Sequence, residues 1–195
     1  MTPLESEWIA LASYPTAPGG AVRGVDIRIA REPRGSLTLQ YVLRADMLHL
    51  RVPPTARPAR ADGLWMHTCF EAFIASAAAS TAYYELNFSP SLQWAIYSFE
   101  AYRQGMSPTA VTVPPKLTVR AFDDRLELDA AIELHDLQAL GATHTLKLAV
   151  TAVIEDDSGT LSYWALKHAP GKPDFHHPDG FALELQGKPM SNQSK

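Results

Sequence analysis

Residues 62–74 have the sequence DGLWMHTCFEAFI, in which a tryptophan, a histidine, the only cysteine and a glutamate lie among apolar residues. In a β-strand, alternate side chains point to opposite faces of the sheet. One face then holds Met66, Thr68, Phe70, Ala72 and Ile74. The other face holds Trp65, His67, Cys69, Glu71 and Phe73. The stretch therefore predicts a strand with an apolar face for the core and a second face of different chemistry.

The same alternation continues in the two following segments, 82–89 and 92–102. Pairing like faces in a hairpin sets the apolar residues opposite one another. The expected partners are Ile74 with Tyr84, Ala72 with Leu86, Phe70 with Phe88, and Glu71 with Asn87. After a tight turn at residues 89–91, the expected partners are Leu86 with Trp94, Tyr84 with Ile96, Asn87 with Gln93, Glu85 with Ala95, and Tyr83 with Tyr97.

Three adjacent strands would thus share one polar and aromatic face. Its candidate ligand-binding residues are Trp65, His67, Glu71, Tyr83, Glu85, Asn87, Gln93 and Tyr97. Carboxylates and amides form hydrogen bonds with hydroxyl groups, and aromatic rings cover the C–H faces of sugars. This pattern favours a carbohydrate or a similar small polar ligand. The alternative is that a loop or a second copy covers the face, with Trp65 as an ordinary core residue.

The rest of the chain is typical of an all-β protein, because proline and glycine fall between short β-rich runs. We expect a two-sheet antiparallel β-sandwich of immunoglobulin-like or jelly-roll type, with about eleven strands. The expected strands are 24–30, 36–44, 47–52, 66–76, 82–89, 92–102, 115–122, 125–133, 145–155, 161–168 and 181–185. One domain should span residues 1–195, with a helical turn at 134–140, a proline-rich rim at 51–60 and a flexible tail at 188–195.

Composition narrows the function classes. The chain has 195 residues, 46% of them hydrophobic, and its 21 acidic and 17 basic residues give a formal charge of −4 without a cationic cluster. This balance predicts no nucleic-acid partner and no membrane-surface partner. A single cysteine and no export signal predict a cytoplasmic protein. The longest aliphatic stretch, Leu148–Ile154, is too short to span a membrane.

Several longer motifs carry a family resemblance. They are GLWMHTCFEAFI and YYELNFSPSLQWAIYSFEAYRQGM between Gly63 and Met106, followed by LKLAVTAVIE, SYWALKH and PDFHHPDGFALEL. Over residues 20–186 the chain resembles uncharacterised bacterial DOMON-like proteins, a group similar to family 9 carbohydrate-binding modules. The resemblance implies a β-sandwich that binds sugar ends between two aromatic side chains, helped by a glutamate and amides.

Placed on this chain, the family pattern matches Trp65 and Glu71, with Asn87 and Gln93 as amide partners. Trp164 of the SYWALKH segment is the candidate for the second aromatic, and His168 lies in the same segment. Strand alternation groups Trp164 with Ser162, so burial is an equal alternative.

Two cofactor hypotheses also follow from the motifs, although we expect no bound cofactor. DOMON domains include haem binders, but Met66 and His67 are adjacent and should diverge, so an axial pair would need Met106 or His168. The loop PDFHHPDG offers a weak divalent-metal set of Asp174, His176, His177 and Asp179. The alternative for this loop is a rigid segment in which a histidine holds the backbone.

An enzyme is the remaining alternative. Glu71 and Glu85 are diagonal neighbours in the expected sheet, and a pair of carboxyl groups performs acid–base chemistry in glycosidases. The chain shows no nucleophile–base motif, glycine-rich phosphate loop or HExxH sequence. We therefore expect a binding module rather than a catalyst. Cys69 is expected to be an inert packed thiol.

Overall fold

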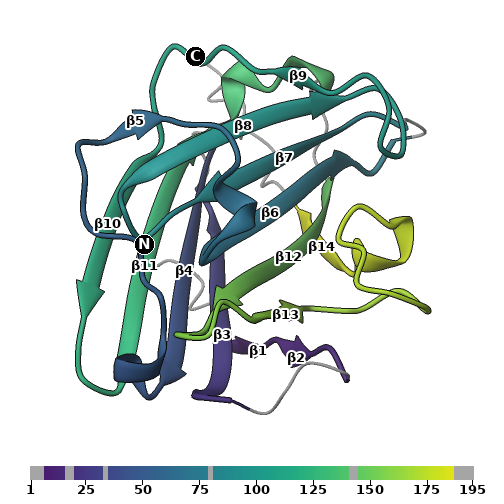
Figure 1. The fold of residues 1–195 in the computed structure, drawn as a ribbon. Coiled ribbons are helices and arrows are strands. Elements are labelled where there is room, and N and C mark those ends of the chain that lie inside the picture. Colours follow the sequence, from purple (N-terminus) through teal and green to yellow (C-terminus); the bar gives the residue numbers. More distant parts are fainter. Residues whose placement is uncertain (1–6, 16–19, 33–34, 79–80, 141–144, 187–195) are drawn as a thin grey trace.

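The computed structural model describes residues 7–15, 20–32, 35–78, 81–140 and 145–186. It is an all-β sandwich of two sheets, as predicted, and its strands cross in two layers (Figure 1). The helical segments of the described residues are short 3₁₀ turns. No helix among them has the length and hydropathy to cross a bilayer. The tail predicted at 188–195 lies outside the described residues.

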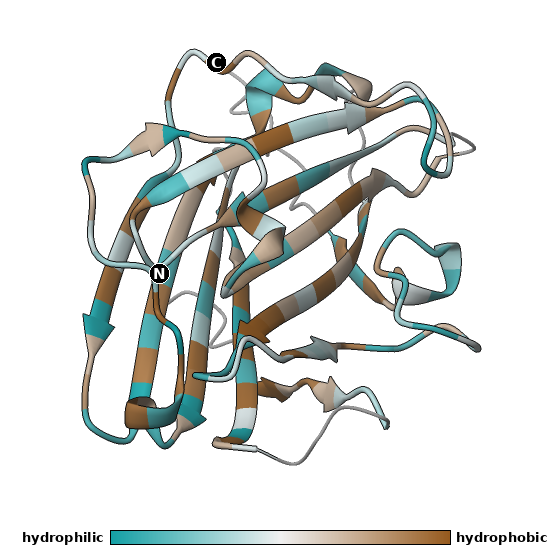
Figure 2. Ribbon diagram, in the orientation of Figure 1, coloured by the Kyte–Doolittle hydropathy of each residue, from teal (hydrophilic) through white to brown (hydrophobic). Residues whose placement is uncertain are grey.

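One sheet is antiparallel and has five strands. Their spatial order is β1 (Ile9–Ala10), β3 (Val22–Arg31), β4 (Ser36–Ala45), β11 (Arg125–Glu133) and β10 (Lys116–Ala121). Along β4 and β11, buried residues alternate with less buried ones, which appears as brown and teal bands in Figure 2. This sheet therefore buries one face against the core and turns the other toward solvent.

The other sheet has nine strands. Its main order is β2 (Ala12–Ser13), β13 (Leu161–Ala165), β12 (Thr145–Glu155), β6 (Cys69–Ser76), β7 (Tyr83–Phe88), β8 (Gln93–Phe99) and β5 (Ala59–Arg60). In addition, β14 (Leu183–Gln186) pairs with β12, and β9 (Ser107–Pro108) pairs with β8. The pairs are antiparallel except β5 with β8. Unlike the smaller sheet, β6 and β7 are buried on both faces.

The main core lies between the two sheets and is made of their inward-facing aliphatic and aromatic side chains. Tyr41 of β4 is fully buried there, and its ring packs against Phe70 at 4.9 Å. Its hydroxyl donates a 2.8 Å hydrogen bond to the backbone carbonyl of Glu71 in the opposite sheet. A polar contact inside the core thus joins the two layers at the strand that carries Glu71.

A second, smaller apolar cluster covers the outer face of the nine-stranded sheet. Its buried members are Phe73, Tyr83, Ala95, Tyr97, Phe99 and Ala149. Leu64 of η2 (Leu64–Met66) packs on it from one side, and Phe175 and Phe181 pack on it from the C-terminal segment. That segment, yellow in Figure 1, lies beside β12 and β14 and includes η5 (Pro178–Gly180). The outer face is therefore covered, which agrees with part of the alternative considered above.

The hairpin register predicted for β6 and β7 is confirmed at all four expected pairs. The register predicted for β7 and β8 has the correct faces but is wrong by two residues, since Leu86 pairs with Ile96 and Glu85 with Tyr97. The turn is longer than expected: the Ser89 N–H bonds to the Gln93 carbonyl, and Leu92 has a φ of 72°. The loop of three residues, 90–92, ends in a left-handed residue and moves every β8 partner by two residues, and this left-handed position is not a glycine that the sequence would have shown.

Other differences are local. The strand predicted at 47–52 is instead η1 (Met47–His49), capped by the Asp46 side chain. Residues 64–66 form a 3₁₀ turn, so β6 begins at Cys69 rather than at residue 66. The helical turn predicted at 134–140 appears as two 3₁₀ turns, η3 (Leu134–Asp136) and η4 (Gln138–Leu140). Short edge strands such as β5 were not predicted, because two residues carry no periodic signal.

The Tyr41 hydroxyl should contribute to stability through its bond across the core. We expect Tyr41→Phe to lower the free energy of unfolding by about 1–2 kcal/mol, because a buried hydrogen bond is lost without a cavity. Urea denaturation measures this value. The matched control is Tyr163→Phe at a partly exposed tyrosine, which should stay within about 0.5 kcal/mol of the wild type. Equal stability of both variants would show that the cross-core bond contributes nothing.

Candidate functional site

A pocket of about 470 Å³ opens on the outer face of the nine-stranded sheet. Its floor is formed by Glu71 and Phe73 of β6 and Glu85 of β7. These residues share one face because they occupy alternate positions on two paired antiparallel strands. The pocket therefore lies on the polar face that the sequence predicted, but it is a recess under covering segments rather than an open surface.

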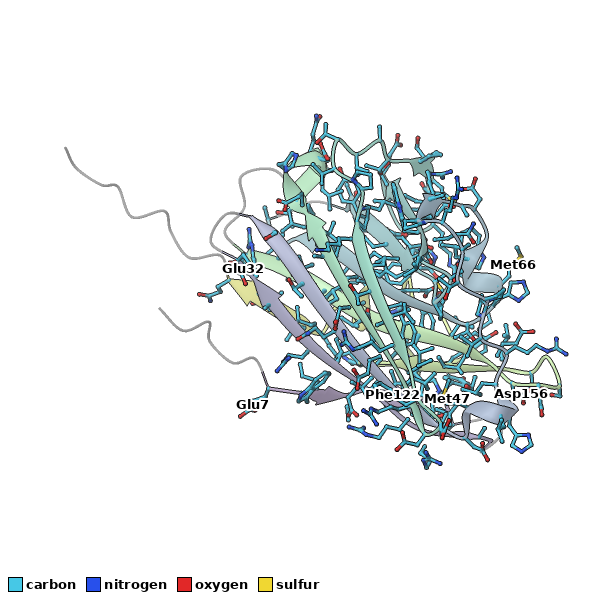
Figure 3. The ribbon with its side chains drawn as sticks, turned by 90° about the vertical axis from the view of Figure 1, so that its left-hand side faces the viewer. Glu7, Glu32, Met47, Met66, Phe122 and Asp156 are labelled. Atoms are coloured by element: carbon cyan, nitrogen blue, oxygen red, sulfur yellow. The ribbon has the colours of Figure 1, made fainter. Side chains whose placement is uncertain are left out.

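The walls of the pocket are formed by residues of the sheet and by residues of the segments that cover it. Trp65 and Met66 come from η2, and Leu161 and Tyr163 come from β13. The remaining wall residues are Phe99, Arg103, Met106, Val153, Pro173, Phe175 and His176. Met66 is 59% exposed and Met106 is 49% exposed. Met66 projects from the surface on the side away from the five-stranded sheet (Figure 3), so both methionines belong to the mouth of the pocket.

The two floor carboxyl groups are buried. Glu71 is 2% exposed and Glu85 is 5% exposed. Glu71 accepts a 3.0 Å hydrogen bond from the Thr151 hydroxyl, and Glu85 accepts one of 2.9 Å from the Asn87 amide. Burial, followed by the nearby charge of Glu85, raises the pKa of Glu71 from 4.5 to about 8. Burial also raises the pKa of Glu85, against the opposing effects of Asn87 and Arg103. At neutral pH, Glu71 is mostly protonated.

The nitrogen groups of the pocket carry little free positive charge. The Arg103 guanidinium forms a 2.7 Å ion pair with Asp174. His176 lies 3.6 Å from the Glu85 carboxyl and shares a 2.9 Å hydrogen bond with the Tyr83 hydroxyl. Burial, followed by the charge of Arg103, lowers the pKa of His176 to about 4. The ring is therefore neutral at pH 7, and its contact with Glu85 is not an ion pair under those conditions.

Trp65 reaches the pocket by a route that strand alternation did not describe. It lies in a 3₁₀ turn, is 36% exposed, and packs edge-on against Tyr97 at 5.8 Å. The Tyr97 hydroxyl donates to Asp62, whose carboxylate also forms a 2.6 Å ion pair with Arg60. Tyr97 therefore supports the Trp65 ring from behind and is not itself among the residues that line the pocket.

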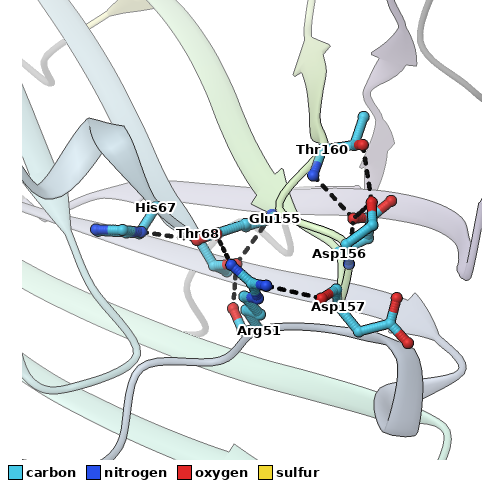
Figure 4. A network of polar contacts seen from close by, with 8 residues as sticks. Arg51, His67, Thr68, Glu155, Asp156, Asp157 and Thr160 are labelled. Atoms are coloured by element: carbon cyan, nitrogen blue, oxygen red, sulfur yellow. Dashed lines mark hydrogen bonds and ion pairs between the residues drawn. The ribbon is translucent and has the colours of Figure 1, made fainter.

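The other end of the 3₁₀ turn is held by a polar network (Figure 4). The His67 ring lies 2.7 Å from Glu155, and the same carboxylate accepts a 3.1 Å bond from Arg51. Thr68 is buried and donates its hydroxyl to the Arg51 carbonyl at 2.7 Å. The hydrogen bond with His67 is the largest cause of the lowered pKa of Glu155. His67 thus positions the turn that carries Trp65 rather than facing the pocket.

Five other predicted residues also lie outside the pocket lining, and one of them, Tyr83, is buried in the smaller apolar cluster. Asn87 is fully buried and binds Glu85 from below. Gln93 lies beside the β7–β8 turn and accepts a bond from Ser91. Trp164 pairs with Ala152 on the inner face of the sheet, where it packs against the main core. His168 bonds to the Ala12 carbonyl at 2.8 Å. The structure therefore does not bring Gln93, Trp164 or His168 to the pocket, and Trp164 is partly buried against the main core.

The described residues show no grouping of side chains that would support the metal hypothesis. Among the described residues, no three His, Cys, Asp or Glu side chains are grouped as a metal site. Asp174 accepts hydrogen bonds from Tyr102, Arg103 and the His176 N–H, and the His177 ring accepts the Asp179 N–H. In this loop the Asp174 carboxylate and the His177 ring thus accept hydrogen bonds from the protein itself. Met66 lines the pocket and His67 turns to Glu155, so these neighbours diverge as expected.

Several pocket residues were not named as candidates from the sequence. Phe73, Phe99 and Tyr163 share the face of Glu71, so alternation could have found them. Arg103, Met106 and Phe175 lie in loops, where no periodic pattern exists. Arg103 has a φ of 53°, and its N–H bonds to the Tyr83 hydroxyl at 3.2 Å. Only the folded loop shows that this side chain reaches the pocket.

Comparison with solved structures identifies the fold. A protein from Bacteroides uniformis, provisionally described as carbohydrate-binding, matches with a TM-score of 0.68 and 18% identity over 93% of this chain and 86% of that one. The chain has the fold of carbohydrate-binding modules of family 9. One such module from Caldicellulosiruptor kristjanssonii, in complex with glucose, has a TM-score of 0.54 and 10% identity over 97% and 87% of the two chains.

A family 9 module from the same organism in complex with cellotriose has a TM-score of 0.51 and 11% identity, covering 85% of this chain and 75% of that one. At these identities the likeness concerns the fold alone. No family model matches the sequence, and no curated protein matches it.

Glu71 should make the protein less stable as the pH rises from 6.5 to 8. Its pKa is raised in the fold, so its contribution is complete below 4.5 and is lost as the pH rises to about 8. His176 has the opposite effect, but its contribution is complete above 6.5. We expect the free energy of unfolding to fall by up to about 1.4 kcal/mol per pH unit in this window.

Urea denaturation at several pH values between 6.5 and 8 measures the slope. Glu71→Gln should remove most of it, because the amide keeps the shape but does not titrate. Glu184→Gln, at a carboxyl with a 59% exposed side chain, is the matched control and should keep the wild-type slope. A slope that survives in Glu71→Gln would show that another group causes it.

Proposed function

We propose that this protein is a non-catalytic binding module for a carbohydrate, with the ligand held in the pocket on the outer face of the nine-stranded sheet. The observation that carries the proposal is the burial of Glu71 and Glu85 at the floor of a recess with aromatic walls. Buried carboxyl groups are costly unless hydrogen-bonded. A ligand rich in hydroxyl groups supplies such bonds.

The walls of the pocket suit the apolar C–H face of a sugar ring. Trp65, Tyr163 and Phe175 come from three separate segments and line the same recess. Their faces and edges offer apolar contact to C–H groups, while the floor offers donors and acceptors. The volume of about 470 Å³ is within the range of small-molecule sites. The complexes of the family 9 modules with glucose and cellotriose support these sugars as the first ligands to test.

Trp65 is expected to be a stacking surface. Trp65→Ala should remove a ring contact worth about 1–3 kcal/mol, which lowers sugar affinity by roughly one to two decades. Titration calorimetry with glucose and cellotriose measures the affinity. The loss of stability should be well below the about 3–5 kcal/mol typical of a core tryptophan, because the ring is partly exposed.

The matched control is Trp8→Ala. Trp8 is 47% exposed and lies against Arg28, whose strand β3 belongs to the five-stranded sheet. This variant should bind as the wild type does. Equal affinity of Trp65→Ala for a sugar that the wild type binds would refute the stacking role, and so would collapse of the fold in that variant.

A hydrolase is the second candidate, favoured by one observation. The pKa of Glu71 is raised to about 8, while Asn87 and Arg103 oppose the rise at Glu85. A protonated carboxyl group beside a second carboxyl group is the usual equipment of an acid and its partner in glycoside hydrolysis. Glu71 would be the acid in such a reaction.

Hydrolysis of 4-nitrophenyl glycosides separates the two candidates. We expect no release of 4-nitrophenol above the buffer rate by the wild type, because the site holds its carboxyl groups for hydrogen bonding. Turnover by the wild type that Glu71→Gln abolishes, while Glu184→Gln keeps it, would reverse this order and make the protein an enzyme.

A further inference from the structure

The charges of the pocket are unbalanced. Its ionisable lining residues are Glu71, Glu85, Arg103 and His176. Arg103 acts on Glu85 from a distance but is already paired with Asp174, and the buried His176 ring, 3.6 Å from Glu85, is neutral at pH 7. A buried carboxylate without a counter-charge is strongly disfavoured. The pocket therefore provides two acidic groups for which the described protein supplies little positive charge.

We propose that the preferred ligand of this pocket is an amino sugar, whose ammonium group lies between Glu71 and Glu85. This inference rests on the proposed carbohydrate-binding function and names the ligand class. The ammonium would take the place of the missing counter-charge, and the sugar hydroxyls would use the remaining acceptors. A neutral sugar would satisfy the hydrogen bonds of the floor but not its charge.

The walls agree with a cationic ligand. Phe73 lies on the same strand face as Glu71, and Trp65, Phe99, Tyr163 and Phe175 also line the recess. Aromatic faces attract an ammonium group at close range. A floor of carboxyl groups with aromatic rings in the walls is the type of site that holds such a cation. An anionic ligand would instead lie against the acidic side chains of Glu71 and Glu85.

Among the described residues, the groups around Glu71 are either uncharged or already paired with another residue. On β12 its partner is the Thr151 hydroxyl, and on β7 the Asn87 amide is used by Glu85. On its own strand, Cys69 is a buried thiol whose pKa is raised by burial. From the covering loops come Arg103, which is paired with Asp174, and the His176 ring. Farther along β12, Glu155 is already bound by His67 and Arg51.

Binding of an ammonium group should change the protonation of Glu71. Near neutral pH the Glu71 carboxyl holds a proton, because its pKa is about 8. An ammonium beside it favours the ionised form, so binding should release this proton to the solvent. A neutral sugar should release none. Proton release thus distinguishes an ammonium at the floor from an amino sugar bound in another orientation.

The test is titration calorimetry at pH 6.5 with glucosamine, glucose and N-acetylglucosamine, in two buffers of different ionisation enthalpy. We expect glucosamine to bind at least about tenfold more tightly than the other two and to release a proton in the wild type. Glu71→Gln and Glu85→Gln should each lose the preference, measured as the ratio of the glucosamine and glucose affinities, and should also weaken glucose binding because both carboxyl groups belong to the floor of the site. Glu184→Gln is the matched control and should keep both the preference and the release.

Each other outcome decides against the inference. Glucose bound as tightly as glucosamine would overturn it and leave the proposed function standing. N-acetylglucosamine bound as tightly as glucosamine would show that the charge of the 2-substituent is not recognised, because the acetamide group is neutral. A preference that survives in both glutamine variants would place the ammonium elsewhere. No binding of any of the three sugars, or of cellotriose, to folded protein would overturn the proposed function as well.

Discussion

The burial of the Glu71 and Glu85 carboxyl groups is the constraint on which the site depends. Both lie on strands buried on two faces, so their outer side is covered by apolar and aromatic residues instead of water. Burial raises the pKa of both groups, and the protein compensates with the Thr151 hydroxyl and the Asn87 amide rather than with a direct arginine or lysine partner. The resulting floor is polar and buried, and hydrogen bonds formed there are stronger than at an exposed surface.

Two polar networks keep the recess open above this floor. On one side, Arg51, Glu155 and Thr68 fix the end of the turn that carries Trp65 (Figure 4). On the other side, Asp174 accepts bonds from Tyr102, Arg103 and the His176 backbone, which joins the loop after β8 to the C-terminal segment. Both networks join loops to other segments of the chain, so the walls of the pocket are held in place before a ligand binds. Binding then costs little conformational entropy of the protein.

The same carboxyl pair supports both candidate functions, and the difference between them is chemical rather than structural. A binding site keeps the proton on Glu71 beside a neutral sugar and releases it to the solvent beside an ammonium group, whereas a hydrolase would transfer that proton to a leaving group. The access of solvent also bears on the choice between the two functions, because the exposed side chains of Met66 and Met106 at the mouth leave the recess open. An open recess suits exchange of a ligand more than protection of a reactive intermediate.

The period-two pattern of residues 69–99 by itself determined the two faces of the central strands, the β6–β7 register and the placement of Glu71, Glu85 and Tyr83 on one side. It did so because strand geometry is local. Strand alternation predicted that Trp65 lies on the ligand-binding face, but the residue reaches the pocket for another reason. Gly63, with a φ of 73°, begins a 3₁₀ turn that carries Trp65 there. Only the tertiary structure decided that Arg103, Met106 and Phe175 line the pocket while His67, Gln93, Trp164 and His168 do not. Loop residues have no periodicity, and their positions follow from contacts such as Arg103 with Asp174 that join segments far apart in the chain.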